Sequence, residues 1–352
     1  MFNPKYKLTN SIVKKLTSIA EARAVIEKAK ILPQYELKLR RQAIIRMTHS
    51  STAIEGNMLL ADQIAALYAD KKIDAPERDI YEAKNYLNAL KYIDEVVTKK
   101  EPVSEKVLLR LHKLVTDKTL SKNQSGFYRK CSVCVVKKRY GMVEEVVYRA
   151  PDFKKVAGLC SDLIKWINES EKEEVSPVVV AGIVHQEIAA IHPFVDGNGR
   201  TARAMATLIL YKRGYDFRRL FALEDYYNED RPSYYEAINA GKSYEERNDD
   251  FTPWLEYFVS GFKEEIDGVK KKVTILSSKK IDNSIGSQIF LDKDQLQIVD
   301  FIDQAGKITV GDVINILNCP KRTAQLHLQK LKKIKMIRQV GRARASAYIM
   351  EK

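Results

Sequence analysis

The sequence is poor in the residues that build disulfide frameworks and metal cages. Its 352 residues include only 4 cysteines and 5 histidines. Two of the cysteines, Cys131 and Cys134, have the spacing of zinc and redox sites, but no second close pair and no His-x-x-His sequence accompanies them. On an extended strand, residues three apart also face opposite sides. The four cysteines are therefore interpreted as reduced, structural thiols.

Long apolar runs are also missing. No run approaches the ~20 residues that a membrane-spanning helix needs, and residues 1–6 contain no secretory hydrophobic region. We therefore expect no membrane association and a cytoplasmic location. The hydrophobic content of 45% supports a substantial core. The net charge of +14 is spread along the chain, so it does not by itself indicate a nucleic-acid partner.

The densest group of chemically active residues is the segment 192–203, His-Pro-Phe-Val-Asp-Gly-Asn-Gly-Arg-Thr-Ala-Arg. A helical pattern begins at Ser176-Pro177 and stops at Pro193, and a second runs from Thr201 to Lys212. The turn predicted between them is Gly197-Asn198-Gly199. Glycines let successive N–H groups converge on an anion where the next helix begins.

The side chains of this segment suit phosphate chemistry. Arg200 and Arg203 lie three residues apart on the second helix, so they can bind phosphate oxygens from one face. Asp196 suits a Mg²⁺ ion that bridges phosphates. A neutral imidazole at His192 is a candidate general base. The segment therefore predicts a phosphate-binding site with a proton acceptor beside it.

The segment resembles the signature of Fic-domain proteins, His-Pro-Phe-x-Asp/Glu-Gly-Asn-Gly-Arg-x-x-Arg, and every fixed position is filled. The resemblance implies an enzyme that moves a nucleoside monophosphate, most often AMP from ATP, onto a protein hydroxyl and releases pyrophosphate. The resemblance implies that His192 deprotonates the hydroxyl and that Asp196 binds Mg²⁺. It implies an anion hole at Gly197, Asn198 and Gly199. It also implies that Arg200 contacts the triphosphate and that Arg203 orients the γ-phosphate. A phosphorylating branch of the family has lysine in place of Gly199, so glycine favours nucleotidyl transfer.

Two further segments fit the same resemblance. Residues 126–147, which begin Gly126-Phe127-Tyr128-Arg129, are predicted to form a β-hairpin. In Fic proteins this hairpin is the flap, and residues near 130–148 would present an extended target segment by strand addition. Tyr234 and Tyr235 stand where the family packs the nucleoside. Neighbouring tyrosines on a helix point differently, so one of the two is expected in the core.

A predicted helix over residues 34–54 carries Ser51, with Glu55 four residues later. Alone, this spacing indicates a solvated charge or a local salt bridge. Beside a Fic core it resembles the family's inhibitory helix, Ser/Thr-x-x-x-Glu-Gly/Asn, which implies that Glu55 pairs with Arg203 in the place of the γ-phosphate. The resting enzyme would then be slow. In some relatives the same glutamate helps remove AMP, so the direction of the reaction stays open.

The predicted fold is mainly α-helical. We expect an N-terminal helical region with the inhibitory helix at residues 1–103, a Fic helical core with a β-hairpin flap at 104–269, a connector rich in Lys and Ser at 270–287, and a winged helix-turn-helix domain at 288–352. The last assignment depends on three short predicted helices, 294–303, 309–317 and 321–334, followed by a hairpin over 336–350.

The C-terminal domain has a local basic side. Residues 321–344 contain nine Lys or Arg and no Asp or Glu. The third helix could enter a major groove of DNA while the hairpin tip reaches a backbone or minor groove. The candidate contacts are Lys321, Arg322, Gln325, Lys330, Arg342 and Arg344. Winged helices also serve as docking or dimerisation modules, so a protein partner and a homodimer stay open.

Two functions follow from the sequence. The first is a protein adenylyltransferase that uses ATP and Mg²⁺, modifies a target protein or itself, and is restrained by Glu55. The second is a DNA-binding transcriptional regulator whose Fic core senses nucleotide or modifies the protein itself. The intact signature favours the first, because a sensor would not need His192 in addition to the phosphate-binding arginines.

Overall fold

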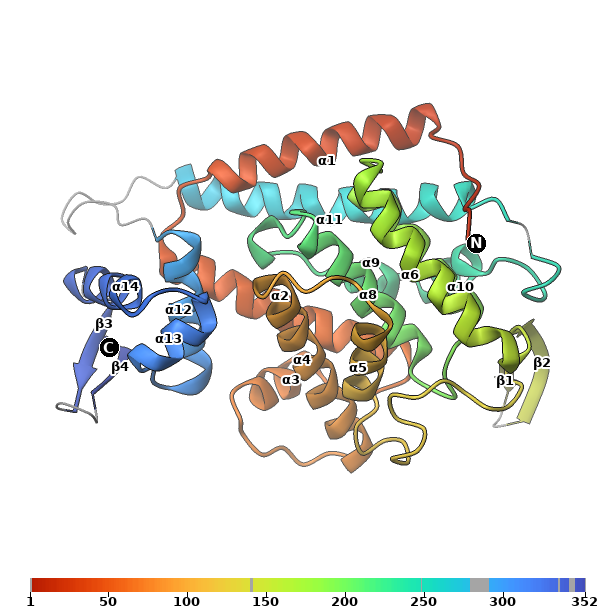
Figure 1. The fold of residues 1–352 in the computed structure, drawn as a ribbon, viewed down its shortest axis with the longest axis horizontal. Helices are drawn as coiled ribbons and strands as arrows, with labels where there is room; N and C mark the ends of the chain where they lie inside the picture. Colours follow the sequence, from red (N-terminus) through yellow and green to blue (C-terminus); the bar gives the residue numbers. More distant parts are fainter. Residues whose placement is uncertain are drawn as a thin grey trace. The chain divides into compact units, whose positions relative to one another are not determined.

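A computed structural model gives the fold and describes residues 2–139, 142–247, 249–278, 291–334, 336–341 and 346–351. These residues are mainly helical and include two small antiparallel sheets (Figure 1). The predicted fold class is confirmed. Among the helices described, none is both long and apolar enough to cross a membrane.

The chain divides into two compact units. The first contains residues 1–27 and 42–270, and the second contains residues 28–41 and 271–352. The second unit therefore includes a segment from near the N-terminus that the sequence did not indicate. Helix α11 (Thr252–Ser278) continues through the first part of the predicted connector, where Val273 is buried. Residues 279–287 of that connector lie outside the described ranges.

The first unit is built around two helices, α7 (Pro177–Ile191) and α8 (Asn198–Lys212), which pack against each other. Helix α7 is buried along nearly its whole length, as expected for a helix in which most residues are apolar. The helices around this pair are α1 (Asn10–Lys28), α2 (Pro33–Ile54), α3 (Ala61–Tyr68), α4 (Glu77–Thr98), α5 (Glu105–Val115), α6 (Val156–Lys172), α9 (Leu223–Glu229) and α10 (Arg231–Ile238).

Helices from several parts of the chain pack around α7 and α8. Helix α1 lies along α11 (Figure 1), and Lys15 Nζ donates a hydrogen bond to Ser260 Oγ at 2.7 Å. Helices α4 and α5 both pack on α8, while α6 packs on α7. The junction between α7 and α8 is therefore surrounded by helices.

The hairpin consists of β1 (Cys134–Arg139) and β2 (Met142–Arg149), with Cys134 opposite Arg149 and two irregularities in the register. It lies at the edge of the unit near α6 (Figure 1). The prediction that the hairpin begins at Gly126 is wrong. Residues 126–129 precede the strands and form a loop, in which Gly126 N–H donates to the His112 ring and not to a strand partner. Tyr140 and Gly141, which follow β1 in the sequence, are not among the described residues.

The second unit contains α12 (Lys293–Ala305), α13 (Val310–Leu317), α14 (Lys321–Lys333), β3 (Ile337–Val340) and β4 (Ala347–Met350), in the predicted order. Its apolar core includes Ile298, Ile302 and Leu328. The start of α2 belongs here because Leu37 packs against this core and Arg40 Nη1 lies 2.6 Å from Asp300 Oδ2.

Candidate functional site

His192 lies where α7 ends. Its backbone is left-handed, with φ 50° and ψ 57°, and Pro193 follows it. The ring Nδ1 lies 3.2 Å from the carbonyl oxygen of Ala189. A carbonyl oxygen only accepts, so the neutral imidazole carries its proton on Nδ1 and keeps a lone pair on Nε2. Burial, together with the charge of Arg129, lowers the pKa of His192, which favours this neutral form near pH 7.

The next helix begins earlier than the sequence indicated. Helix α8 starts at Asn198 and not at Thr201, so two residues of the predicted turn, Asn198 and Gly199, belong to the helix. The side chain of Asn198 explains the early start, because it accepts from Phe194 N at 2.9 Å and donates to Phe194 O at 3.0 Å. Gly197 precedes the helix with φ 78°, and a Cβ there would lie 2.7 Å from Thr116 Cγ2. The first N–H groups of α8 lack intrahelical partners, which makes this end a candidate anion site.

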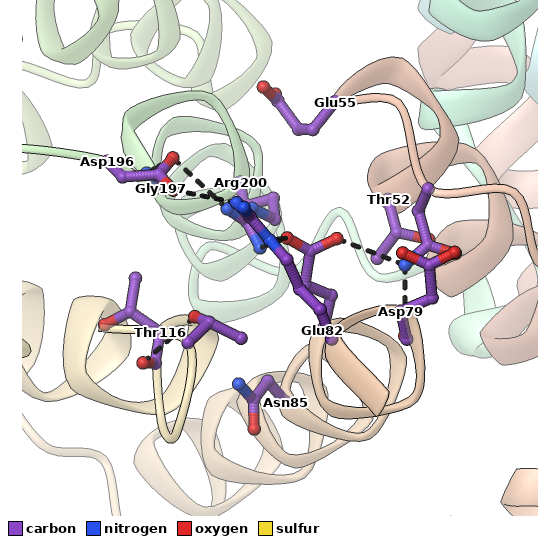
Figure 2. A network of polar contacts seen from close by, with 12 residues as sticks. Thr52, Glu55, Asp79, Glu82, Asn85, Thr116, Asp196, Gly197 and Arg200 are labelled. Atoms are coloured by element: carbon purple, nitrogen blue, oxygen red, sulfur yellow. Dashed lines mark hydrogen bonds and ion pairs between the residues drawn. The ribbon is translucent and has the colours of Figure 1, made fainter. Parts of the chain in front are cut away.

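Arg200 projects from the first turn of α8 and is only 1% exposed. Its Nη2 lies 3.4 Å from Asp196 Oδ1, and its Nη1 lies 3.3 Å from Glu82 Oε1 (Figure 2). Among the described residues, neither Nε nor Nη1 has a hydrogen-bond partner of good geometry. Buried donors without such partners are costly, and phosphate oxygens would satisfy them.

Glu82, from α4, is a member of the site that the sequence did not reveal. Figure 2 shows its carboxylate between Arg200 and the segment after α2. Its Oε2 accepts from Asn57 Nδ2 at 3.1 Å, and its Oε1 accepts from Arg78 Nε at 3.2 Å. Glu82 thus balances the buried charge of Arg200 and joins it to the residues that follow Glu55.

Arg203 is 2% exposed and faces the end of α2. Its Nε donates to Ser51 Oγ at 2.9 Å, and its Nη2 donates to Ser51 O at 2.8 Å and to Glu55 Oε1 at 2.7 Å. The structure therefore brings together Ser51, Glu55 and Arg203, as the resemblance to the inhibitory helix implied. A Cβ on Gly199 would lie 2.3 Å from Glu55 Oε1, so this carboxylate also reaches the first turn of α8.

The two candidate aromatic residues take different positions on α10. Tyr234 is 2% exposed, and its hydroxyl lies 3.0 Å from His185 Nε2 and 3.4 Å from Arg203 Nη1. Tyr235 is 49% exposed, and its hydroxyl donates to Ile54 O at 2.9 Å. Tyr234 is therefore the core residue of the pair, and Tyr235 keeps a ring surface that a ligand could contact.

Asp196 precedes the anion site, and its side chain is 40% exposed. Within the described ranges, no group of three or more His, Cys, Asp or Glu side chains could hold a metal ion alone. Mg²⁺ commonly binds through one or two carboxylates together with substrate phosphates and waters. Asp196 beside an anion site fits a Mg²⁺ that arrives with a nucleotide.

Residues 102–210 match the model of the Fic/DOC family. This part of the chain is therefore similar to a Fic domain. A protein adenylyltransferase Fic from Nematostella vectensis is 27% identical over 252 residues, which are 69% of this chain and 53% of the relative. One from Drosophila grimshawi is 29% identical over 202 residues, 57% of this chain and 38% of the relative. The chain thus spans about half of the first relative and less of the second.

Solved structures show the same fold. A Fic family protein from Desulfovibrio desulfuricans G20 aligns with a TM-score of 0.64 at 22% identity, over 99% of this chain and 98% of that one. Fic-1 from C. elegans aligns with a TM-score of 0.60 at 22% identity, over 75% of this chain and 73% of that one. The fold around the Fic domain is therefore shared by these structures.

His112, on α5, is another member of the Fic domain site that the sequence reasoning missed. Burial lowers the pKa of His112 to about 4, so the ring is neutral. Its Nδ1 accepts from Gly126 N at 2.9 Å, which leaves Nε2 to donate to Asp196 O at 3.0 Å. The ring also stacks on Phe194, with 3.6 Å between centroids. A lone histidine on an apolar helix face gave no signal of this role.

The candidate DNA contacts lie in the other unit, outside the Fic domain. Helix α14 buries Ala324, Leu328 and Leu331, whereas the side chains of Lys321, Arg322, Gln325 and Lys330 are exposed. Leu326 on the same helix is also exposed, at 49%. Arg342 and Arg344 are not among the described residues.

Proposed function

We propose that this protein is a protein adenylyltransferase that transfers AMP from ATP to a side-chain hydroxyl of a target protein or of itself. One observation carries the proposal: His192, with Nε2 left to accept a proton, ends the helix α7 just before α8 begins, and the first two turns of α8 carry the buried Arg200 and Arg203. Two relatives named protein adenylyltransferase Fic support this assignment. ATP is the substrate in this reading, and the exposed ring of Tyr235 is the candidate contact for the adenosine.

The chemistry follows from the positions of these groups. The target hydroxyl attacks the α-phosphorus, its proton passes to His192 Nε2, and the bond to pyrophosphate breaks. The N–H groups of α8, with Arg200 and Arg203, neutralise the triphosphate during this exchange. Asp196 would hold Mg²⁺, which supplies further charge neutralisation when it is bound.

The hairpin β1–β2 is the proposed docking element for the target protein. Val135 and Val146 on its strands are 38% and 42% exposed. An extended target segment could add to the sheet edge by main-chain hydrogen bonds, with its side chains meeting such apolar positions. The hydroxyl of that segment would then be presented to His192.

We further propose that Glu55 inhibits the reaction. It occupies donors of Arg203 that the γ-phosphate would otherwise use, because a carboxylate and a phosphate satisfy the same guanidinium fork. The alternative role for Glu55 is to position a water molecule that removes AMP from a modified protein.

Labelled nucleotide distinguishes these possibilities. The wild-type protein, Glu55→Gly and Glu55→Gly/His192→Ala are incubated with Mg²⁺, a cell lysate and ATP labelled at the α- or the γ-phosphate. We expect protein to be labelled from α-labelled ATP alone, only when His192 is present, and more strongly without Glu55. Label from γ-labelled ATP would instead show phosphate transfer. Release of AMP from labelled protein by the wild type, but not by Glu55→Gly, would show the reverse reaction.

DNA binding is a second candidate function, supported by the exposed polar face of α14. We propose that the C-terminal unit is a winged helix-turn-helix whose third helix meets DNA. Electrophoretic mobility of random-sequence DNA at rising salt tests this proposal, because phosphate contacts make affinity fall steeply with salt. Sedimentation of the same protein tests whether it forms a homodimer. If DNA does not bind at low salt, the regulator reading is wrong.

A further inference from the structure

Arg129 is a buried arginine in the loop before β1, with 3% of its surface exposed. Its guanidinium donates to three backbone carbonyls. Nε donates to His192 O at 2.8 Å, Nη1 to Cys131 O at 2.8 Å, and Nη2 to Pro151 O at 2.6 Å. Its own backbone N–H donates to Pro193 O at 3.0 Å. All four of these hydrogen bonds are made within the chain itself.

The three carbonyls come from functionally different segments. Cys131 lies just before β1, and Pro151 lies just after β2. The two ends of the hairpin are therefore bonded to the same guanidinium as the carbonyl of His192. That residue has a left-handed backbone, which is unfavourable for a side chain other than glycine and persists only where its surroundings hold it. The Arg129 bonds to the carbonyls of His192 and Pro193 supply such support.

We propose that Arg129 is a positioning residue that sets the geometry between the target-docking hairpin and His192, so that a hydroxyl carried on the hairpin reaches the imidazole. This inference rests on the proposed adenylyltransferase function. Arginine suits the task because its planar fork directs several donors at once, whereas the ammonium of lysine is a compact point charge on a flexible stem. The GFYR sequence at residues 126–129 thus has a structural purpose outside the strands.

The charge of Arg129 gives a second, separable effect. Burial and Arg129 lower the pKa of His192, whereas the Ala189 carbonyl, Glu55 and Asp196 raise it. Arg129→Lys keeps the positive charge but loses the planar guanidinium with its several donors, whereas Arg129→Gln loses both the charge and the guanidinium. The two variants therefore separate geometry from charge.

Both substitutions are made in the Glu55→Gly protein. Arg213→Lys is the matched control, because Arg213 also donates to a backbone carbonyl, that of Ile167, and to Ser170 Oγ at 3.0 Å. The measurements are the affinity for ATP, the rate of AMP transfer, hydrogen exchange of the β1 and β2 amides, and the His192 titration followed by NMR.

We expect both Arg129 variants to lose about 100-fold in kcat, the scale of a misplaced reacting group, with unchanged ATP affinity and faster exchange in the hairpin. The pKa of His192 should rise in Arg129→Gln and stay in place in Arg129→Lys. Arg213→Lys should change none of these quantities.

The inference is wrong if the Arg129 variants keep a normal kcat or if hydrogen exchange in the hairpin is unchanged. It is also wrong if ATP affinity and kcat fall in parallel, because that result indicates a general loss of structure. If the Glu55→Gly parent transfers no AMP, the proposed function fails. Hairpin exchange and the His192 titration still test the positioning role in that case, because neither depends on the reaction.

Discussion

Replacing Glu55 tests the interaction that ties α2 to the anion site. Glu55 Oε1 lies 2.7 Å from Arg203 Nη2, with 29% of the glutamate side chain and 1% of the arginine side chain exposed. Glu55→Gly removes the carboxylate and leaves Ser51 and Tyr234 on the guanidinium. Glu55→Gln keeps the length of the side chain and a hydrogen-bond acceptor but removes the charge.

The expected magnitude follows from the nature of this contact. A hydrogen bond to a charged group contributes about 1.5–3 kcal/mol, and a γ-phosphate must displace it before Arg203 becomes available. Since about 1.4 kcal/mol corresponds to a tenfold change in affinity, productive ATP binding should tighten by about 10- to 100-fold in Glu55→Gly. Glu55→Gln should fall between this variant and the wild type.

Calorimetry with ATP and Mg²⁺ measures the affinity, and α-labelled ATP measures the transfer rate. Thermal unfolding supplies an independent measurement, because a ligand that binds the folded state tightly raises its stability. Glu173→Gly serves as the control, since Glu173 also lies in the turn after a helix, α6. The reasoning is refuted if Glu55→Gly and wild type bind ATP equally and transfer AMP equally fast.

Three other predictions concern proton equilibria and DNA. In the Glu55→Gly protein, AMP transfer should decline on the acid side with an apparent pKa below the ordinary histidine value of about 6.5, because the pKa of His192 is lowered; an acid limb above that value would contradict the proposed base. Burial raises the pKa of Glu224 from 4.5 to about 7, so ionisation of this acid should cost stability as the pH rises through that window. Glu224→Gln keeps an acceptor for the Tyr86 hydroxyl but cannot ionise. Urea unfolding should therefore show that this substitution stabilises the protein by about 3 kcal/mol more at a pH above 7 than at a pH below 4.5. An equal effect at the two pH values would show that the carboxyl does not titrate in this range. Lys321→Ala should weaken binding to all DNA sequences alike and reduce the salt slope by about 1, and an unchanged slope would place DNA, if it binds, elsewhere.

The sequence predicted the parts of the site that lie close together along the chain. Helical periodicity placed the junction at His192, and the family signature linked Arg203 to Glu55 across the chain. The early start of α8 was missed because glycine and asparagine read as a turn, whereas the Asn198 side chain bonds to both backbone groups of Phe194 and lets the helix begin.

The supporting residues could not be found from local pattern. Glu82 is an ordinary acidic residue on a helix until the fold places it beside Arg200, and His112 is a lone histidine on an amphipathic helix. Arg129 binds carbonyl groups, and any residue type can supply a carbonyl. A backbone carbonyl does not depend on the residue type that carries it, so the sequence does not indicate which residue is the partner. These roles can be seen only in the three-dimensional structure.

The continuity of α2 limits how the protein can be dissected. Residues 33–41 of this helix belong to the second compact unit, where Leu37 packs on the core, while residues 42–54 belong to the first and include Ser51. A deletion intended only to remove the inhibitory segment would also strip apolar cover and the Arg40–Asp300 ion pair from the C-terminal unit. Point substitution at Glu55 is therefore the cleaner genetic tool, and phenotypes of N-terminal truncations would report on both units at once.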